Sequence, residues 1–125
     1  MSAGGILQSA IAGALGAVSD LTGVFDGPPA RAAYPYAVID AGNESDWSHK
    51  SGDGREVLVA VTVWDDQPVR LHQLADAVEA ALAALGALTG WDLVTLRIIR
   101  RKVVRDVAGP WAAVLDFRAR MLAAA

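Results

Sequence analysis

Hydrophobic residues recur at helical spacing in two stretches of the chain. Residues 5–20 and 69–86 each have apolar residues three or four positions apart, which is the period of one face of an α-helix. The positions are Leu7, Ile11, Leu15 and Val18 in the first stretch, and Leu71, Leu74, Ala75, Val78, Leu82 and Leu85 in the second. Ser2 stands where it can cap the first helix, and Pro68 suits the start of the second. The pattern therefore predicts two amphipathic helices.

Four other stretches favour β-strands. Residues 36–42 follow Pro35, where a proline is tolerated, and residues 56–64 alternate strictly. In residues 56–64 four valines share one face, and the other face holds Leu58, Ala60, Thr62 and Trp64. Because both faces are largely apolar, we expect a central strand covered on each side. Residues 22–35, rich in Gly and Pro, are expected to form a loop.

Residues 91–104 and 111–120 predict a second hairpin, joined by the turn sequence DVAG. In the first of these strands, Arg100, Arg101 and Lys102 place charge on both faces, which indicates a bulge or a strand that extends beyond the sheet. The expected order is helix, strand, strand, helix, strand, strand. The sequence thus predicts a single α+β domain over residues 1–125, with two hairpins and two helices packed on an antiparallel or mixed sheet.

Composition restricts the possible functions. A chain of 125 residues fits one domain, and its 54% hydrophobic residues leave more apolar surface than a small monomer hides, so we expect contact with another subunit. The net charge of −3 argues against wrapping nucleic acid. The absence of cysteine excludes disulfides and thiolate chemistry. The Ala- and Gly-rich N-terminus lacks a basic start, and Asp76 and Glu79 interrupt residues 74–88, so we expect no membrane segment.

Residues suited to catalysis do not form a recognisable motif. His49 and His72 fit no metal-binding spacing, and no serine lies in a GxSxG sequence. Asp65 and Asp66 precede a helix, so turn and cap roles are favoured over acid–base chemistry. We therefore expect no enzyme activity, cofactor or metal. The alternative in this class is an enzyme that holds a divalent metal with four carboxylates, those of Asp46, Asp53, Asp65 and Asp66.

Two segments are candidates for binding a partner. Residues 97–105 carry five cations, and at strand spacing Arg97, Arg101 and Arg105 fall on one side. This cluster fits an acidic partner as well as it fits a charged edge strand that resists aggregation. Residues 46–55 form a polar connection that holds the aromatic residue Trp47; its candidate interface residues are Asp46, Trp47, Lys50 and Arg55. Because aromatic residues and arginines dominate interface energies, docking of Trp47 is favoured over local packing.

The stretch PYAVIDAGNESDWSHKSGDGREVLVAVTVW resembles the hallmark region of a small family of tail terminator, or tail-completion, proteins from siphophages and gene transfer agents. The matching features are the Pro-Tyr start, the Asp-Trp-Ser and Lys of the loop, the following glycines and the Val-Trp end of the strand. They correspond here to Pro35, Tyr36, Asp46, Trp47, Ser48, Lys50, Gly52, Gly54, Val63 and Trp64. The closing RDVAGPWAAVLDFRAR is similar to the final hairpin of that family, although the tip DVAGPW departs from its plain Asp-Gly turn.

The resemblance implies a structural virion protein that is assembled in the bacterial cytoplasm and stands at the head–tail junction. Such a protein forms a ring, usually of six copies, that caps the tail tube protein and meets the head-tail connector or stopper protein, while DNA passes through the lumen without specific binding. An acidic subunit suits that lumen because it repels phosphate. The alternative from another class is a non-catalytic dimeric adaptor that buries its apolar excess at one two-fold interface.

Overall fold

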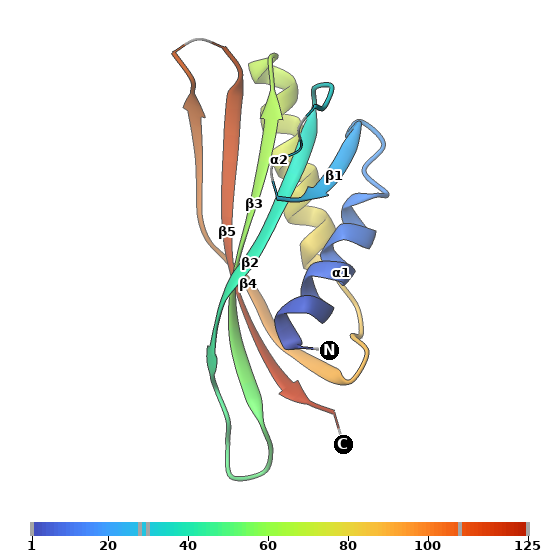
Figure 1. The fold of residues 1–125 in the computed structure, drawn as a ribbon, viewed down its shortest axis with the longest axis vertical. Helices are drawn as coiled ribbons and strands as arrows, with labels where there is room; N and C mark the ends of the chain where they lie inside the picture. Colours follow the sequence, from blue (N-terminus) through green and yellow to red (C-terminus); the bar gives the residue numbers. More distant parts are fainter. Residues whose placement is uncertain (1, 28, 30, 108, 125) are drawn as a thin grey trace.

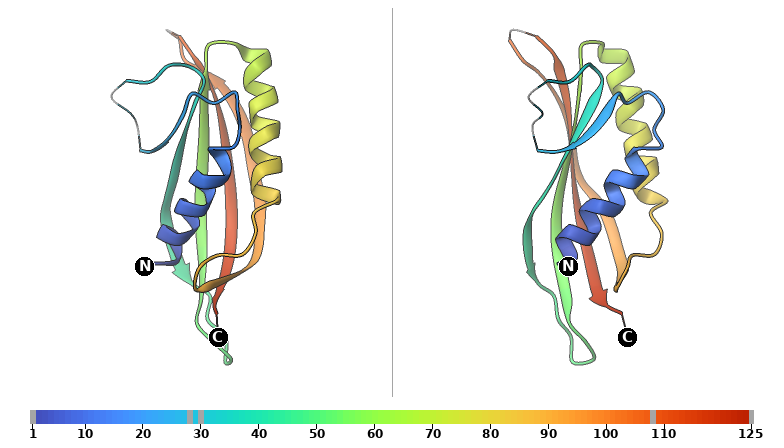
Figure 2. Two further views of the ribbon diagram at one scale, coloured as in Figure 1. Left: turned by 90° about the vertical axis from the view of Figure 1, so that its right-hand side faces the viewer. Right: turned by 45° about the vertical axis from the view of Figure 1, so that its right-hand side comes forward.

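Two helices lie on the same face of a twisted five-stranded β-sheet (Figures 1 and 2). The computed structural model describes residues 2–27, 29, 31–107 and 109–124. The elements are α1 (Ala3–Leu15), β1 (Gly23–Asp26), β2 (Tyr36–Asp46), β3 (Gly54–Asp65), α2 (Pro68–Ala83), β4 (Trp91–Arg105) and β5 (Trp111–Ala123). The α+β prediction with two hairpins is confirmed, and β1 is an additional element.

The strands lie in the order β1-β2-β3-β5-β4. The hairpins β2–β3 and β4–β5 are antiparallel, and the antiparallel pairing of β3 with β5 joins them into one sheet. β1 pairs in parallel with the first four residues of β2. The two edges of the sheet are therefore β4 on one side and, on the other, β1 followed by the second half of β2.

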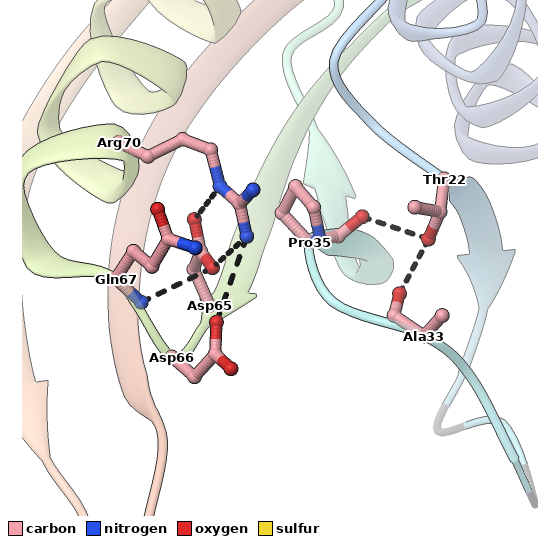
Figure 3. Close-up of polar contacts among 7 residues, drawn as sticks. All are labelled: Thr22, Ala33, Pro35, Asp65, Asp66, Gln67 and Arg70. Carbon is pink, nitrogen blue, oxygen red and sulfur yellow. Dashed lines mark hydrogen bonds and ion pairs between the residues drawn. The ribbon is translucent and has the colours of Figure 1, made fainter.

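The prediction that residues 22–35 are a loop throughout is wrong, because residues Gly23–Asp26 form β1. The strand is only four residues long and its own pattern is weak, so it depends on its neighbour for backbone hydrogen bonds. Thr22 fixes its start: the Thr22 amide donates to the Pro35 carbonyl at 2.8 Å, and the hydroxyl bonds the Ala33 and Pro35 carbonyls (Figure 3). Tertiary pairing thus makes a strand where local sequence favours a turn.

The core lies between the sheet and the helices. Its members are the inward alternate residues of β3 and β5 together with the apolar stripes of both helices. They include Leu7, Ile11, Leu15, Val57, Val59, Val61, Val63, Leu71, Leu74, Val78, Leu82, Leu115, Phe117 and Met121. Ser2 caps α1 as predicted, since its hydroxyl accepts from the Gly5 amide at 3.1 Å. No helix in the described part of the chain is long and apolar enough to span a membrane.

The second face of β3 is uncovered, contrary to the prediction that both faces are covered. β3 is central, as expected, because it pairs with β2 and β5. Both helices, however, pack on the other face (Figure 2), and Leu58 on the uncovered face is 42% exposed. We call this uncovered side the outer face of the sheet. Its apolar residues on β3 explain the alternation pattern and leave a surface that this chain does not bury.

Candidate assembly surfaces

The connection between β2 and β3 projects beyond the end of the sheet as a narrow hairpin (Figure 1). We call residues 46–55 the arm. Its backbone is closed by a hydrogen bond from the Trp47 amide to the Gly54 carbonyl at 2.9 Å and by paired bonds between His49 and Gly52. The Ser48 hydroxyl accepts from the Gly54 amide and donates to the Asp46 carboxylate at 2.6 Å. These bonds give the arm a defined shape in the isolated chain.

Gly54 allows the two sides of the arm to approach each other. A Cβ atom at this position would lie 2.2 Å from the Trp47 carbonyl oxygen and 3.0 Å from a methyl carbon of Leu122. Because the first of these atoms belongs to the backbone, the clash could be relieved only by moving the chain. The base of the arm therefore requires glycine at residue 54.

Trp47 is half-buried and contacts side chains of its own subunit. Its ring lies edge-on to His49, with centroids 4.5 Å apart, and the Arg120 guanidinium sits 5.5 Å from its centroid. Arg120 also forms an ion pair with Glu56 at 3.0 Å. The local contacts hold the indole at the base of the arm with part of its surface free. Its role as a docking anchor stays a prediction.

The other predicted arm residues lie in different surroundings. Arg55 pairs with Glu44 at 3.6 Å, and Glu44 also accepts from the Gly4 amide at 2.8 Å, so these contacts connect the arm to the start of α1. Lys50 is exposed at the tip and has no ion-pair partner among the described residues. The Asp46 carboxylate accepts the hydrogen bond from the Ser48 hydroxyl within the arm. Lys50 is thus the arm cation that is most available to a partner.

The basic cluster is divided between the two faces of β4. The register with β5 shifts between Ile98 and Arg100, which confirms a bulge. Arg97 pairs with Arg118 on the outer face, whereas Arg101 pairs with Leu115 on the face that holds the helices. The prediction that Arg97, Arg101 and Arg105 share one side is therefore wrong, because the extra residue at the bulge reverses the alternation.

Arg101 and Arg105 already have partners within the subunit. The Arg101 guanidinium bonds the Asp76 carboxylate at 2.7 Å and the Glu79 carboxylate at 3.2 Å, both on α2. The hydrogen bond with Asp76 is the main reason that the pKa of Arg101 is raised above its usual value. Arg105 lies 5.3 Å from the ring centroid of Trp111. Arg101 thus joins β4 to α2, whereas Arg105 packs on β5. Among the described residues, Arg97 is the member of the predicted trio that has no such partner.

The outer face carries two shallow depressions that share Asp40 and Ala60. One, of about 470 Å³, lies over Leu58, Ile99 and Asp116; the other, of about 430 Å³, lies over Tyr36, Val38 and Trp64. Their lining is mostly apolar, so covering it with another molecule would remove apolar surface from water. The apolar residues on both faces of β3 are a sequence signal for this surface, because such a pattern predicts covering on each side without showing which molecule supplies it.

The carboxylates of the metal alternative do not meet. β3 separates Asp46 and Asp53 from Asp65 and Asp66, and its twelve residues span about 36 Å. Asp65 is fully buried; it accepts from Arg70 at 2.6 and 2.7 Å and from the Gln67 amide at 3.2 Å (Figure 3). Burial acts to raise the pKa of Asp65, but these hydrogen bonds outweigh it and the pKa is lowered. Asp65 therefore joins β3 to α2, as the predicted turn and cap role requires.

Comparison with known proteins places this fold in a family. The model of the family described as "Tail completion protein gp17" matches residues 8–122. Among solved structures, a chain from the virion of a native gene transfer agent particle superposes with a TM-score of 0.81 at 30% sequence identity, covering 94% of this chain and 96% of that one. No curated protein matches the chain. The chain thus belongs to the tail completion protein gp17 family, a family of structural tail proteins.

Proposed function

We propose that this protein is a ring-forming tail terminator that caps the tail tube and joins it to the head connector of a phage or gene transfer agent particle. The observation that carries this proposal is the full-length match to a chain of a native gene transfer agent virion, because it covers nearly all of both chains. The family match over residues 8–122 supports a role in completing the tail. Six copies at the head–tail junction is the arrangement that the resemblance implies.

The outer face supports assembly into a larger particle. Several apolar side chains on it remain partly exposed, with Leu58 at 42% and Ile99 at 56%. Burying such groups contributes about 25 cal/mol for each Å² of apolar surface removed from water. In a monomer this surface stays in water and contributes no such free energy. Contact with a neighbouring copy or a tail component would bury it. The protein then acts through contacts rather than through chemistry.

The arm is proposed to reach an adjacent subunit, the tube or the connector. It extends past the sheet (Figure 1), its tip presents Lys50, and part of the Trp47 ring is free at its base. Aromatic rings in such positions make strong interface anchors. The net charge of −3 on each copy suits a ring through which DNA passes, because the ring as a whole does not attract phosphate.

Negative-stain microscopy of the purified protein, alone and mixed with purified tail tubes, tests the proposal. Rings, or a cap at one end of each tube, are the expected result. A stable dimer that ignores tube ends would instead favour the adaptor function, in which two copies bury their outer faces at one two-fold interface. The mass of the particle in solution, measured by light scattering, separates these two outcomes before any microscopy.

A further inference from the structure

Opposite charges gather at the two opposite edges of the sheet. Residues 97–105, in the β4 edge strand, include five cations and no carboxylate. Residues 20–46, which build the β1–β2 edge, include five carboxylates and one cation, Arg31. A chain with this separation has two different and complementary edges. Such edges favour head-to-tail contacts between copies, and contacts of that kind form a ring when the rotation from one copy to the next closes.

Two of the β4 cations are free to pair with another molecule. Arg97 and Lys102 are exposed and have no ion-pair partner in the part of the chain that the structure describes. They lie on the outer side of β4, opposite Arg118 and Val114 of β5. The remaining cations are engaged by Asp116, by α2 and by Trp111, as described above for Arg101 and Arg105. Arg97 and Lys102 are therefore the cations of this edge that are available to form ion pairs with another molecule.

Asp26 and Asp40 are the carboxylates of the other edge that are available to form ion pairs. Both are exposed, and both line the depression over Tyr36 and Trp64. Asp40 accepts only a local hydrogen bond, from the Gly42 amide at 3.0 Å, and neither residue has an ion-pair partner among the described residues. By contrast, Glu44 and Asp46 at the same edge are already bound by Arg55 and Ser48.

The register of the sheet sets these groups at matching heights. Asp40 pairs with Ala60 of β3, Ala60 pairs with Asp116 of β5, and Asp116 pairs with Arg100 of β4. Arg97 and Lys102 lie just to either side of Arg100, and Asp26 pairs next to Asp40, with Ile39. Rotation about an axis parallel to the strands moves no residue along that axis. In a ring built with this orientation, the cations of one copy would meet the carboxylates of the next.

We propose that neighbouring copies in the ring meet edge to edge, with Arg97 and Lys102 on β4 of one copy against Asp26 and Asp40 of the next. The inference rests on the proposed ring and names its subunit contact. The contact is between side chains, because a Lys- and Arg-rich edge opposes main-chain pairing with another strand. Each copy donates one edge and receives the other.

Charge reversal at each edge tests this contact. One variant carries R97E and K102E, and the other carries D26K and D40K. Each alone places like charges at every boundary, so we expect assembly to need more than a tenfold higher concentration. An equal mixture restores opposite charges at every boundary when the two variants alternate. We therefore expect the mixture to form rings again, with equal numbers of both chains by native mass spectrometry.

A matched control reverses one cation at the acidic edge. R31E makes the same kind of change as R97E, but it adds negative charge to the edge that is already acidic, so assembly should not weaken. Circular dichroism of each variant, with a thermal melt, checks that the fold is kept. Rings formed by either reversed variant alone, or no recovery in the mixture of folded variants, would overturn the edge contact. If the unmodified protein caps tail tubes in that case, the proposed function still stands; if it forms neither rings nor caps, the proposed function itself fails.

Discussion

Replacing Asp65 with asparagine tests the physical account of the junction between β3 and α2. The side chain is fully buried, and its two oxygens accept hydrogen bonds from the Arg70 guanidinium at 2.6 and 2.7 Å. A third hydrogen bond comes from the backbone N–H of Gln67 (Figure 3). Asparagine has nearly the same shape and can keep the Gln67 bond. It loses the charge, and its amide group faces the guanidinium, so the bidentate pair is broken.

The expected loss follows from the bonds that are broken. Hydrogen bonds to a charged group contribute about 1.5–3 kcal/mol each, and Asp65→Asn removes one and weakens the other, so we expect roughly 2–3 kcal/mol. For a domain of this size each kcal/mol corresponds to about 4 °C in melting temperature. The variant should therefore melt roughly 8–12 °C below the unmodified protein at pH 7.

The pH dependence gives a second, independent readout. The pKa of Asp65 is lowered in the folded protein, so its contribution is complete above the unfolded pKa of about 3.9 and is lost as the pH falls through the lower, folded value. The difference in stability between the unmodified protein and Asp65→Asn should therefore shrink below about pH 4. Asp66→Asn is the matched control: Asp66 is exposed, 3.6 Å from Arg70, and its loss should leave the melt unchanged. Equal melts for the two variants, or a difference that does not vary with pH, would refute the reasoning.

Three further predictions concern the arm and the assembly. Trp47→Ala should stay folded, because Trp47 is outside the core, but should fail to cap tail tubes in microscopy; normal caps would refute its anchor role. Gly54→Ala should lower the free energy of unfolding by about 1–3 kcal/mol through its clash with Trp47, whereas Gly52→Ala, with open space around it, should melt normally; equal denaturant midpoints would contradict the model of the arm. Ring assembly, followed by light scattering, should weaken between about 0.05 and 0.5 M salt, and assembly indifferent to salt would exclude ion pairs as its basis.

The two helices and the long strands could be predicted from the spacing of apolar residues. The residues at that spacing are the ones that the folded chain buries in its core. The stripe from Leu71 to Leu82 is buried as predicted, and so is the alternation of β5 from Ala113 to Ala119. The break in pattern at residues 100–102 correctly indicated a bulge. It did not show that Arg101 would face Asp76 and Glu79, because that contact depends on where α2 packs.

Other features depend on partners that lie far away in the sequence. β1 forms because β2 supplies its backbone hydrogen bonds, so the four residues Gly23–Asp26 do not by themselves predict a strand. The apolar outer face of β3 was visible in the sequence, but periodicity reports which side chains avoid water and not which molecule covers them. The proposed edge contact also depends on the strand order, because Asp40 and Arg97 lie at opposite edges of the sheet only once β5 is placed between β3 and β4.

The strand order also has a consequence for the timing of synthesis. β5 comes after the other strands in chain order, yet it lies between β3 and β4, and among the described residues β4 pairs with no other strand. While the ribosome is still translating residues 111–123, β4 has no neighbour and β3 lacks one of its two. We therefore expect the basic edge to form only after β5 has paired with β4. Copies that end before β5 should then be unable to make the proposed edge contact, so that only subunits with a complete sheet would enter the proposed ring.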